Sequence, residues 1–266
     1  MNNVKRPLLS AALLGTIVLA CLLAGVFAPG DATRMDFYAS LVPPDAAHPF
    51  GTDQLGRDLF KMILHGGRVS LIIGLLASCA AALIAVVYGT AAGLAPRWLD
   101  NFLMRVTELI MSIPPILYVI TLLAALGKPT MLSLSLVIGV TSWMNIAKIV
   151  RAEVRQIRRS EHILAARLMG APFLYTLRRH LLPNFMPSIM FMLISNVSQA
   201  IAAEATLSFL GLGMPPGSAT WGTLMGLSED ALLTNSWWII LIPSLFLITT
   251  LICIVNIGEY LRRVQH

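Results

Sequence analysis

Long apolar runs separated by shorter polar segments form the main pattern along this sequence. Each run is close to the ~20 residues that an α-helix needs to cross the ~30 Å hydrocarbon core of a bilayer. A membrane β-barrel would instead show segments of about ten residues in which apolar and polar positions alternate. The pattern therefore predicts an all-α membrane protein with six transmembrane helices, at residues 8–28, 69–94, 103–126, 131–147, 188–210 and 237–257.

The first run follows Lys5 and Arg6, as the apolar core of a secretory signal would. It covers residues 8–28, which is longer than the 7–15 residues of a typical signal core. We therefore expect it to remain as the first transmembrane helix, after a short N-terminal segment at residues 1–7. An external loop at residues 29–68 follows, and residues 69–266 hold the other five transmembrane helices.

Lys and Arg residues are distributed unequally between the two sides that these helices define. Six crossings place both termini on one side, which then holds fourteen of the nineteen Lys and Arg residues, whereas the other side holds five. Cytoplasmic segments of membrane proteins carry such an excess. We therefore expect both termini in the cytoplasm, and this orientation accounts for the net charge of +6 without nucleic acid as a partner.

Composition agrees with this interpretation. Apolar side chains make up 57% of the 266 residues and charged ones 12%, whereas soluble proteins carry about 25% charged residues. The lipid bilayer is therefore the expected surrounding, and no length remains for a second soluble domain of ~100 residues. Cys21, Cys79 and Cys253 lie in separate apolar runs, so we expect no disulfide or metal site from them.

A basic segment separates the fourth and fifth apolar runs. It holds eight of the nineteen Lys and Arg residues between Lys148 and Asn184, beside two acids. Its apolar positions favour two short helices, and Gly170, Ala171 and Pro172 suit the turn between them, since glycine permits a backbone reversal and proline fits a first helical turn. The segment predicts a cytoplasmic helical hairpin at residues 151–184. Its arginines alone would also serve as headgroup anchors.

The hairpin resembles the coupling motif of ATP-binding-cassette (ABC) importer permeases, which reads Glu-Ala-Ala, three residues, Gly, nine residues, Ile, any residue, Leu-Pro. Leu164 stands in place of the motif's Glu and His180 in place of its Ile. Two further regions, residues 48–71 and residues 204–222, resemble permeases of dipeptide, oligopeptide and nickel importers. The residues that match the coupling motif are Ala165, Ala166, Gly170, Leu182 and Pro183.

This resemblance implies a type I ABC importer permease fold in a bacterial inner membrane. It implies three kinds of partner: a second, homologous permease in a heterodimer, two cytoplasmic ATPase subunits that hold ATP and magnesium, and an extracytoplasmic substrate-binding protein. The chain would form half of a path for short peptides, with nickel or a metal chelate as the alternative cargo. The implied contacts with the ATPase are made by Ala165, Ala166, Gly170, Ala171, Arg178, Arg179, Leu182 and Pro183.

We expect no catalytic residue, cofactor or metal ion in this chain itself. A phosphate-binding Walker loop needs Gly, four residues, Gly-Lys and then Ser or Thr. Gly127-Lys128 has Leu122 in place of the first glycine and Pro129 in place of the hydroxyl residue. The five histidines are scattered over the sequence without the spacing of metal ligands.

Polar residues of the external loop precede a predicted amphipathic helix at residues 55–65, which we expect to lie at the membrane interface. They either form a docking surface for the substrate-binding protein or cap and order the loop through ion pairs. These residues are Gly51, Thr52, Asp53, Gly56, Arg57 and Asp58.

Glu204 is an acid well inside an apolar run, where a charge costs several kcal/mol unless it faces a cavity or a partner. Asn196 lies on the same helix face and Gln199 adjoins it. Glu204 therefore either lines the transport path or anchors the loop that follows its helix. The competing function is a proton-coupled carrier, with Glu204 as the proton-binding group. A milder polar patch on the fourth run is formed by Thr141, Ser142 and Asn145.

Overall fold

The computed structural model describes residues 7–127, 129–158, 182–215, 217–227, 231 and 234–265, with the side chains of residues 182–188 and 265 left out. Within these ranges the regular secondary structure is helical, and the only β-type pairing is an isolated bridge between Thr52 and Asp58. The expected all-α fold is confirmed. Its helices are α1 (Leu8–Leu22), α2 (Ala24–Phe27), the 3₁₀ helix η1 (Phe37–Ala39), α3 (Leu59–Leu94), α4 (Arg97–Met111), α5 (Pro115–Leu126), α6 (Met131–Ser142), α7 (Met144–Ile157), α10 (Leu182–Phe209), α11 (Trp221–Gly226) and α13 (Trp237–Gln265).

Three helices are each long and apolar enough to cross a membrane. They comprise α3, residues Ile189–Phe209 of α10, and Trp237–Val264 of α13. Two bent pairs, α4 with α5 and α6 with α7, raise the number of candidate spans to five, and α1 is shorter, with 15 residues. The prediction of six crossings therefore stays a prediction, while several membrane-crossing helices are confirmed.

The third apolar run is broken in the middle. α4 ends at Met111 and α5 begins at Pro115, and the two helices meet at 85°. Pro114 and Pro115 lack backbone N–H donors, and a residue before proline is disfavoured in helical conformation. The proline pair thus accounts for the break beside Ser112.

The fourth run is also bent, by 49° between α6 and α7, although it contains no proline. The Thr141 hydroxyl donates to the carbonyls of Val137 and Ile138, each at 2.9 Å. Such bonds from threonine to the preceding turn compete with the helical ladder and bend helices. Trp143 lies at the junction between the two helices.

The prediction of a separate amphipathic helix at residues 55–65 is wrong. α3 begins at Leu59 and continues for 36 residues, so residues 59–65 form its first two turns and residues 55–58 precede it. Asp58 caps the helix by accepting hydrogen bonds from the Phe60 and Lys61 amides. Leu59 and Ile63 are fully buried in a core shared with α1, α11 and α13, instead of lying on a lipid surface.

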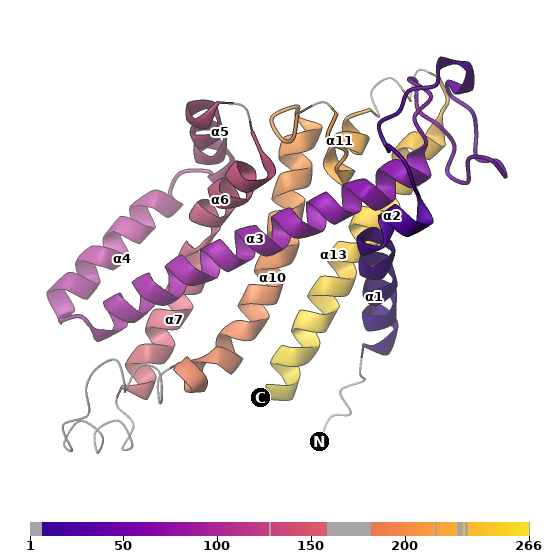
Figure 1. The fold of residues 1–266 in the computed structure, drawn as a ribbon. Coiled ribbons are helices and arrows are strands. Elements are labelled where there is room, and N and C mark those ends of the chain that lie inside the picture. The colour runs from indigo at the N-terminus through magenta and orange to yellow at the C-terminus, as the bar shows by residue number, and fades with distance from the viewer. Residues whose placement is uncertain are drawn as a thin grey trace.

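α3 crosses the molecule diagonally and contacts most of the other helices (Figure 1). Glycines on α3 and α6 permit this close packing. A Cβ at Gly89 would lie 2.6 Å from the carbonyl oxygen of Ala147 on α7, and one at Gly139 would lie 2.7 Å from that of Ala77 on α3. Small residues at helix crossings let backbones approach in this way.

The beginning of α1, the end of α7, the beginning of α10 and the end of α13 lie at the same end of the molecule (Figure 1). The loop before α3 and the helix α11 lie at the other end. The helix ends nearest the two termini and the helix ends that flank residues 159–181 therefore share one end, as the predicted topology requires. The assignment of this end to the cytoplasm stays a prediction.

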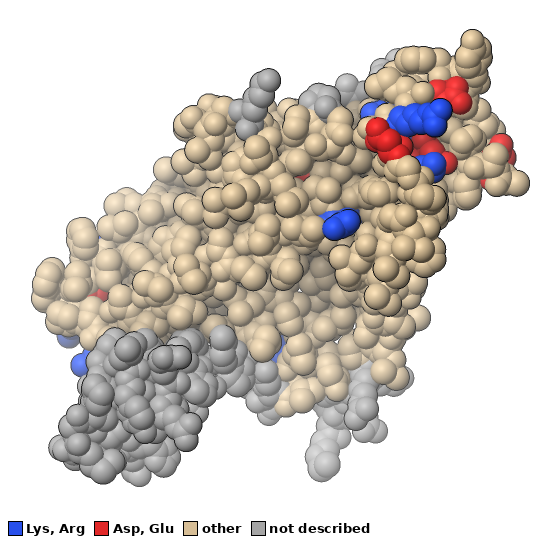
Figure 2. Space-filling view, viewed as in Figure 1, with Lys and Arg blue, Asp and Glu red and all other residues tan. Residues whose placement is uncertain are grey.

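Charged residues are unevenly placed on the face seen in Figure 2. Acidic and basic side chains gather at the end that carries the loop before α3, and uncharged residues cover most of the middle. The uncharged surface includes exposed Leu75, Leu83 and Val87 of α3. Such a belt suits contact with lipid tails.

Candidate functional site

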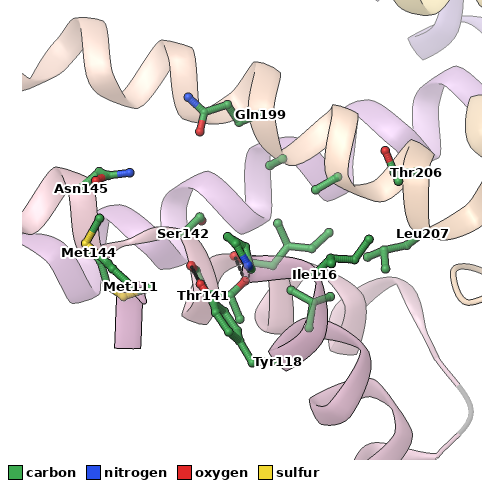
Figure 3. A pocket seen from close by; sticks show the side chains of 15 residues that line it. Met111, Ile116, Tyr118, Thr141, Ser142, Met144, Asn145, Gln199, Thr206 and Leu207 are labelled. Carbon is green, nitrogen blue, oxygen red and sulfur yellow. Dashed lines mark hydrogen bonds between the residues drawn. The ribbon is translucent and has the colours of Figure 1, made fainter. Parts of the chain in front are cut away.

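A cavity of about 360 Å³ lies between α5, α6, α7 and α10 (Figure 3). It borders both of the helix breaks, because Met111 and Pro115 flank the first and Ser142 and Met144 flank the second. The breaks thus create the space that straight helices would fill. The lining consists of Met111, Pro115, Ile116, Tyr118, Val119, Ile138, Thr141, Ser142, Met144, Asn145, Gln199, Ala200, Ala203, Thr206 and Leu207.

Two side-chain amides reach this cavity from facing helices. Asn145 lies in the first turn of α7, and Gln199 lies on α10 (Figure 3). Both side chains are exposed, and neither forms a hydrogen bond with another described residue. Each amide therefore has a free donor and a free acceptor for a ligand.

Hydroxyl groups supply the rest of the polar lining. Tyr118 on α5 donates to the Thr141 carbonyl at 3.1 Å, which links α5 to the bend between α6 and α7. The Thr206 hydroxyl donates to the Ala202 carbonyl at 2.8 Å and keeps acceptor capacity on the cavity side. The described lining is uncharged. It can therefore hydrogen-bond a polar molecule without selecting for its charge.

Sequence reasoning grouped Asn196, Gln199 and Glu204, but the structure separates them. Gln199 lines the cavity, whereas Asn196 and Glu204 are buried with 4% and 0% exposure and do not line it. Conversely, Thr141, Ser142 and Asn145, which formed only a secondary patch in the sequence, lie across the cavity from Gln199. The bend at Trp143 brings them there, in a run that contains no proline.

Glu204 connects three helices inside the bundle. Ser70 of α3 donates to its Oε2 at 2.9 Å, and Ser208 of α10 donates to its Oε1 at 2.7 Å. The Ser70 hydroxyl in turn accepts a hydrogen bond from the Trp221 amide at the beginning of α11, at 3.2 Å. This geometry supports the anchoring interpretation of Glu204 over a place on the transport path.

Residues 51–58, which the sequence places in an external loop, form an internally bonded loop before α3. Arg57 contacts Oδ2 of Asp53 through Nε and Nη2, each at 2.6 Å, and the Arg57 amide donates to Oδ1 at 2.8 Å. Asp58 caps α3 and contacts His48 Nδ1 at 3.1 Å. These bonds support the interpretation that the charges order the loop.

The loop is also attached to α13. The Trp238 indole donates to the Thr52 carbonyl at 3.1 Å, and Thr52 is fully buried. Gly51 and Gly56 have positive φ angles of 74° and 70°, and a Cβ at Gly56 would overlap the Asp36 carbonyl. Both glycines are thus required by the backbone.

The predicted ATPase-contacting residues lie largely outside the described part of the chain. This applies to Ala165, Ala166, Gly170, Ala171, Arg178 and Arg179. Leu182 and Pro183 stand at the beginning of α10, and their side chains are not described. The hairpin itself stays a prediction.

The sequence analysis missed an ion cluster at the end of the molecule where α7 ends. Arg151 and Arg155 of α7 both bind Asp100 of α4, and Arg158 donates to the Leu94 carbonyl at 3.0 Å. These arginines had been interpreted only through their charge. Their spacing of four and three residues on one helix was the available signal, but the partner lies 51 residues away in sequence.

Comparison with known proteins places this architecture among transport components. Residues 84–264 match the family described as binding-protein-dependent transport system inner membrane component. The chain is 34% identical to the dipeptide transport system permease protein DppC of Bacillus subtilis (strain 168), over 98% of this chain and 87% of that protein. It is also 34% identical to the oligopeptide transport system permease protein OppC of the same organism, over 97% of this chain and 84% of that protein.

Proposed function

The chain belongs to the family of binding-protein-dependent transport system inner membrane components, and we propose that it forms one wall of a peptide path in an ATP-driven importer. It is a multi-pass inner membrane protein. The observation that carries the proposal is the uncharged cavity between α5, α6, α7 and α10, whose largely apolar lining includes the amides of Asn145 and Gln199 and several hydroxyl groups. Polar groups at this depth are costly unless they line a path or find partners.

The cavity suits a peptide backbone. A peptide bond carries one donor and one acceptor, and the free amides of Asn145 and Gln199 offer the complementary pair. Because the described lining is uncharged, peptides with different side chains would meet the same contacts. The relatives named as dipeptide and oligopeptide permeases support this substrate class.

Nickel or a metal chelate is less well supported as cargo. Divalent transition metals bind imidazole, carboxylate or thiolate ligands. The described lining residues of the cavity carry none of these groups, and the described residues contain no group of three or more His, Cys, Asp and Glu that could hold a metal ion. A peptide is therefore the cargo that we propose.

One chain does not enclose the path. α5 exposes Ile116 and Leu117 beside the cavity, with 40% and 54% exposure. We assign this face to a second, homologous permease, whose contact would close the open side in a heterodimer. An extracytoplasmic substrate-binding protein would deliver the peptide at the end that carries the loop before α3.

Residues 151–184 are assigned the contact with two cytoplasmic ATPase subunits, which would hold ATP and magnesium. In this assignment the permease chain is not a catalyst and binds no cofactor. Movement of the segment that follows α7 would pass into α7, which lines the cavity with Met144 and Asn145 at its other end. A single helix, α7, would then transmit movement from the proposed contact to the proposed path.

The test is ATP-driven uptake into proteoliposomes that contain the complete importer and its binding protein. We expect uptake of labelled dipeptides or short oligopeptides, dependence on ATP, and no uptake of nickel. Gly170→Trp should abolish uptake together with peptide-stimulated ATP hydrolysis. Uptake that continues without ATP, stops with a protonophore and is lost in Glu204→Gln would instead establish the proton-coupled carrier.

A further inference from the structure

Asp100 lies in the first turn of α4, and its side chain is fully buried. Arg151 binds the carboxylate through Nε and through Nη2, the latter 2.6 Å from Oδ2, and Arg155 Nη2 lies 2.8 Å from the same oxygen. We call these three residues the Asp100 ion cluster. Bidentate pairing of this kind fixes the relative orientation of the two groups.

α7 is attached to α3 at the same end of the molecule. Arg158, just after the last residue of α7, donates to the carbonyl of Leu94, the last residue of α3. A Cβ at Gly93 would lie 2.8 Å from Cγ1 of Val154, so the two helices are in close contact there. Among the described residues, the hydrogen bonds between α7 and α4 are those of the Asp100 ion cluster.

Both helices that the cluster joins extend to the cavity. Met111, the last residue of α4, lines it from one side, and Met144 and Asn145 at the beginning of α7 line it from another. α4 has 15 residues, which corresponds to roughly 20 Å at 1.5 Å per residue. On α4 the cluster and the cavity therefore lie at opposite ends, and on α7 Arg151 lies at the middle of the helix with Arg155 one turn further from the cavity.

We propose that the Asp100 ion cluster is the joint that makes α4 move with α7 when residues 159–181 are displaced, so that two walls of the cavity shift together. This inference rests on the proposed function, which gives these residues the ATPase contact. Separating the helices would leave a buried carboxylate without its counterions, which is strongly unfavourable. Asp100 and Arg151 are thus positioning residues for transport.

The experiment measures the number of ATP molecules hydrolysed per peptide imported, in proteoliposomes with the complete importer. Asp100→Asn keeps the size of the side chain and removes its charge. We expect the ATP-to-peptide ratio to rise at least tenfold, because α7 would move without α4. The matched control is Arg105→Gln, which removes an exposed ion pair with Glu108 on the same helix and should leave the ratio unchanged.

A purely structural role would lower uptake and ATP hydrolysis in parallel, and a ratio within twofold of the wild type would overturn the inference. If the importer with Asp100→Asn fails to assemble, the same ratio is measured with Arg151→Lys. Lysine keeps the positive charge but cannot make the bidentate contact with Asp100. It should raise the ratio at least threefold, and an unchanged ratio again overturns the inference. A wild-type importer that takes up no peptide would refute the proposed function instead.

Discussion

The Ser70 hydroxyl donates a 2.9 Å hydrogen bond to Oε2 of Glu204, which joins α3 to α10 at a fully buried position. Ser208 occupies the other carboxylate oxygen. A buried acid with a hydrogen bond at each oxygen is part of the internal framework. Polarity alone therefore does not distinguish a residue that holds the helices together from one that lines the transport path. The hydrogen-bond partners of the residue do.

Glu204→Ala should destabilise the folded protein more than Glu204→Gln. Alanine leaves the Ser70 and Ser208 hydroxyls without their acceptor, which costs about 1–3 kcal/mol for an unsatisfied buried group. Glutamine keeps one acceptor oxygen. The measurement is the thermal unfolding midpoint of the purified complex in detergent, with Glu108→Gln as an exposed control. An unchanged midpoint in Glu204→Ala would contradict the anchoring role.

Gln199→Leu should reduce peptide uptake about tenfold without a change in the unfolding midpoint. Leucine has a similar size and removes the free amide, and a lost hydrogen bond of about 1.4 kcal/mol corresponds to a factor of ten. Initial uptake rates at a subsaturating peptide concentration provide the measurement. Met190→Leu, at an exposed position on the same helix, is the control. Equal initial uptake rates for Gln199→Leu and the wild type would show that the Gln199 amide does not bind the peptide on its path.

Gly89→Leu should destabilise the packing of α3 on α7, because a side chain there meets the Ala147 carbonyl and Val150. Overpacking of this kind typically costs about 1–3 kcal/mol. The same change at Gly15, which has no atom within 4 Å of a built Cβ, should be tolerated. The measurements are the yield of folded protein that is recovered in detergent and the thermal unfolding midpoint, both compared between the two variants. Similar behaviour of both would show that the α3–α7 contact is looser than described.

Asp53→Ala should make the loop before α3, residues 51–58, less ordered. Arg57 would keep a mostly buried guanidinium without its partner, and breaking one side of such a pair costs about 3–5 kcal/mol when fully buried. Hydrogen exchange of the amides of residues 51–58 should become at least tenfold faster. Asp31→Ala serves as the control, since Asp31 is exposed and, among the described residues, its carboxylate accepts hydrogen bonds only from neighbouring Thr33. If the amides of residues 51–58 still exchange slowly in Asp53→Ala, contacts other than the Asp53–Arg57 pair keep the loop ordered.

The long apolar runs were sufficient to predict the helical membrane fold, and the break beside Ser112 follows from the proline pair that comes after it. The bend at Trp143 was not predictable in the same way, because it depends on which carbonyls the Thr141 hydroxyl selects. The first turns of α3 were misassigned for a related reason. An apolar face at Leu59 and Ile63 has the same pattern whether it meets lipid or a protein core.

The candidate site could be predicted only in part. Gln199 was named because it adjoins an intramembrane acid, although that acid turned out to be bonded to Ser70 and Ser208. The spacing of the arginines on α7 does not identify Asp100 as their partner, since Asp100 and Arg151 meet only through the packing of α4 and α7.

The central claim is that a peptide passes the cavity lined by Asn145 and Gln199. Its most direct test places a photo-reactive amino acid at position 199 of the complete importer and illuminates it during ATP-driven uptake of a radiolabelled peptide. We predict that label is recovered on this chain, that it requires ATP and the binding protein, and that the same probe at exposed Leu75 gives none. Active uptake without labelling at position 199, or equal labelling at position 75, would contradict the account.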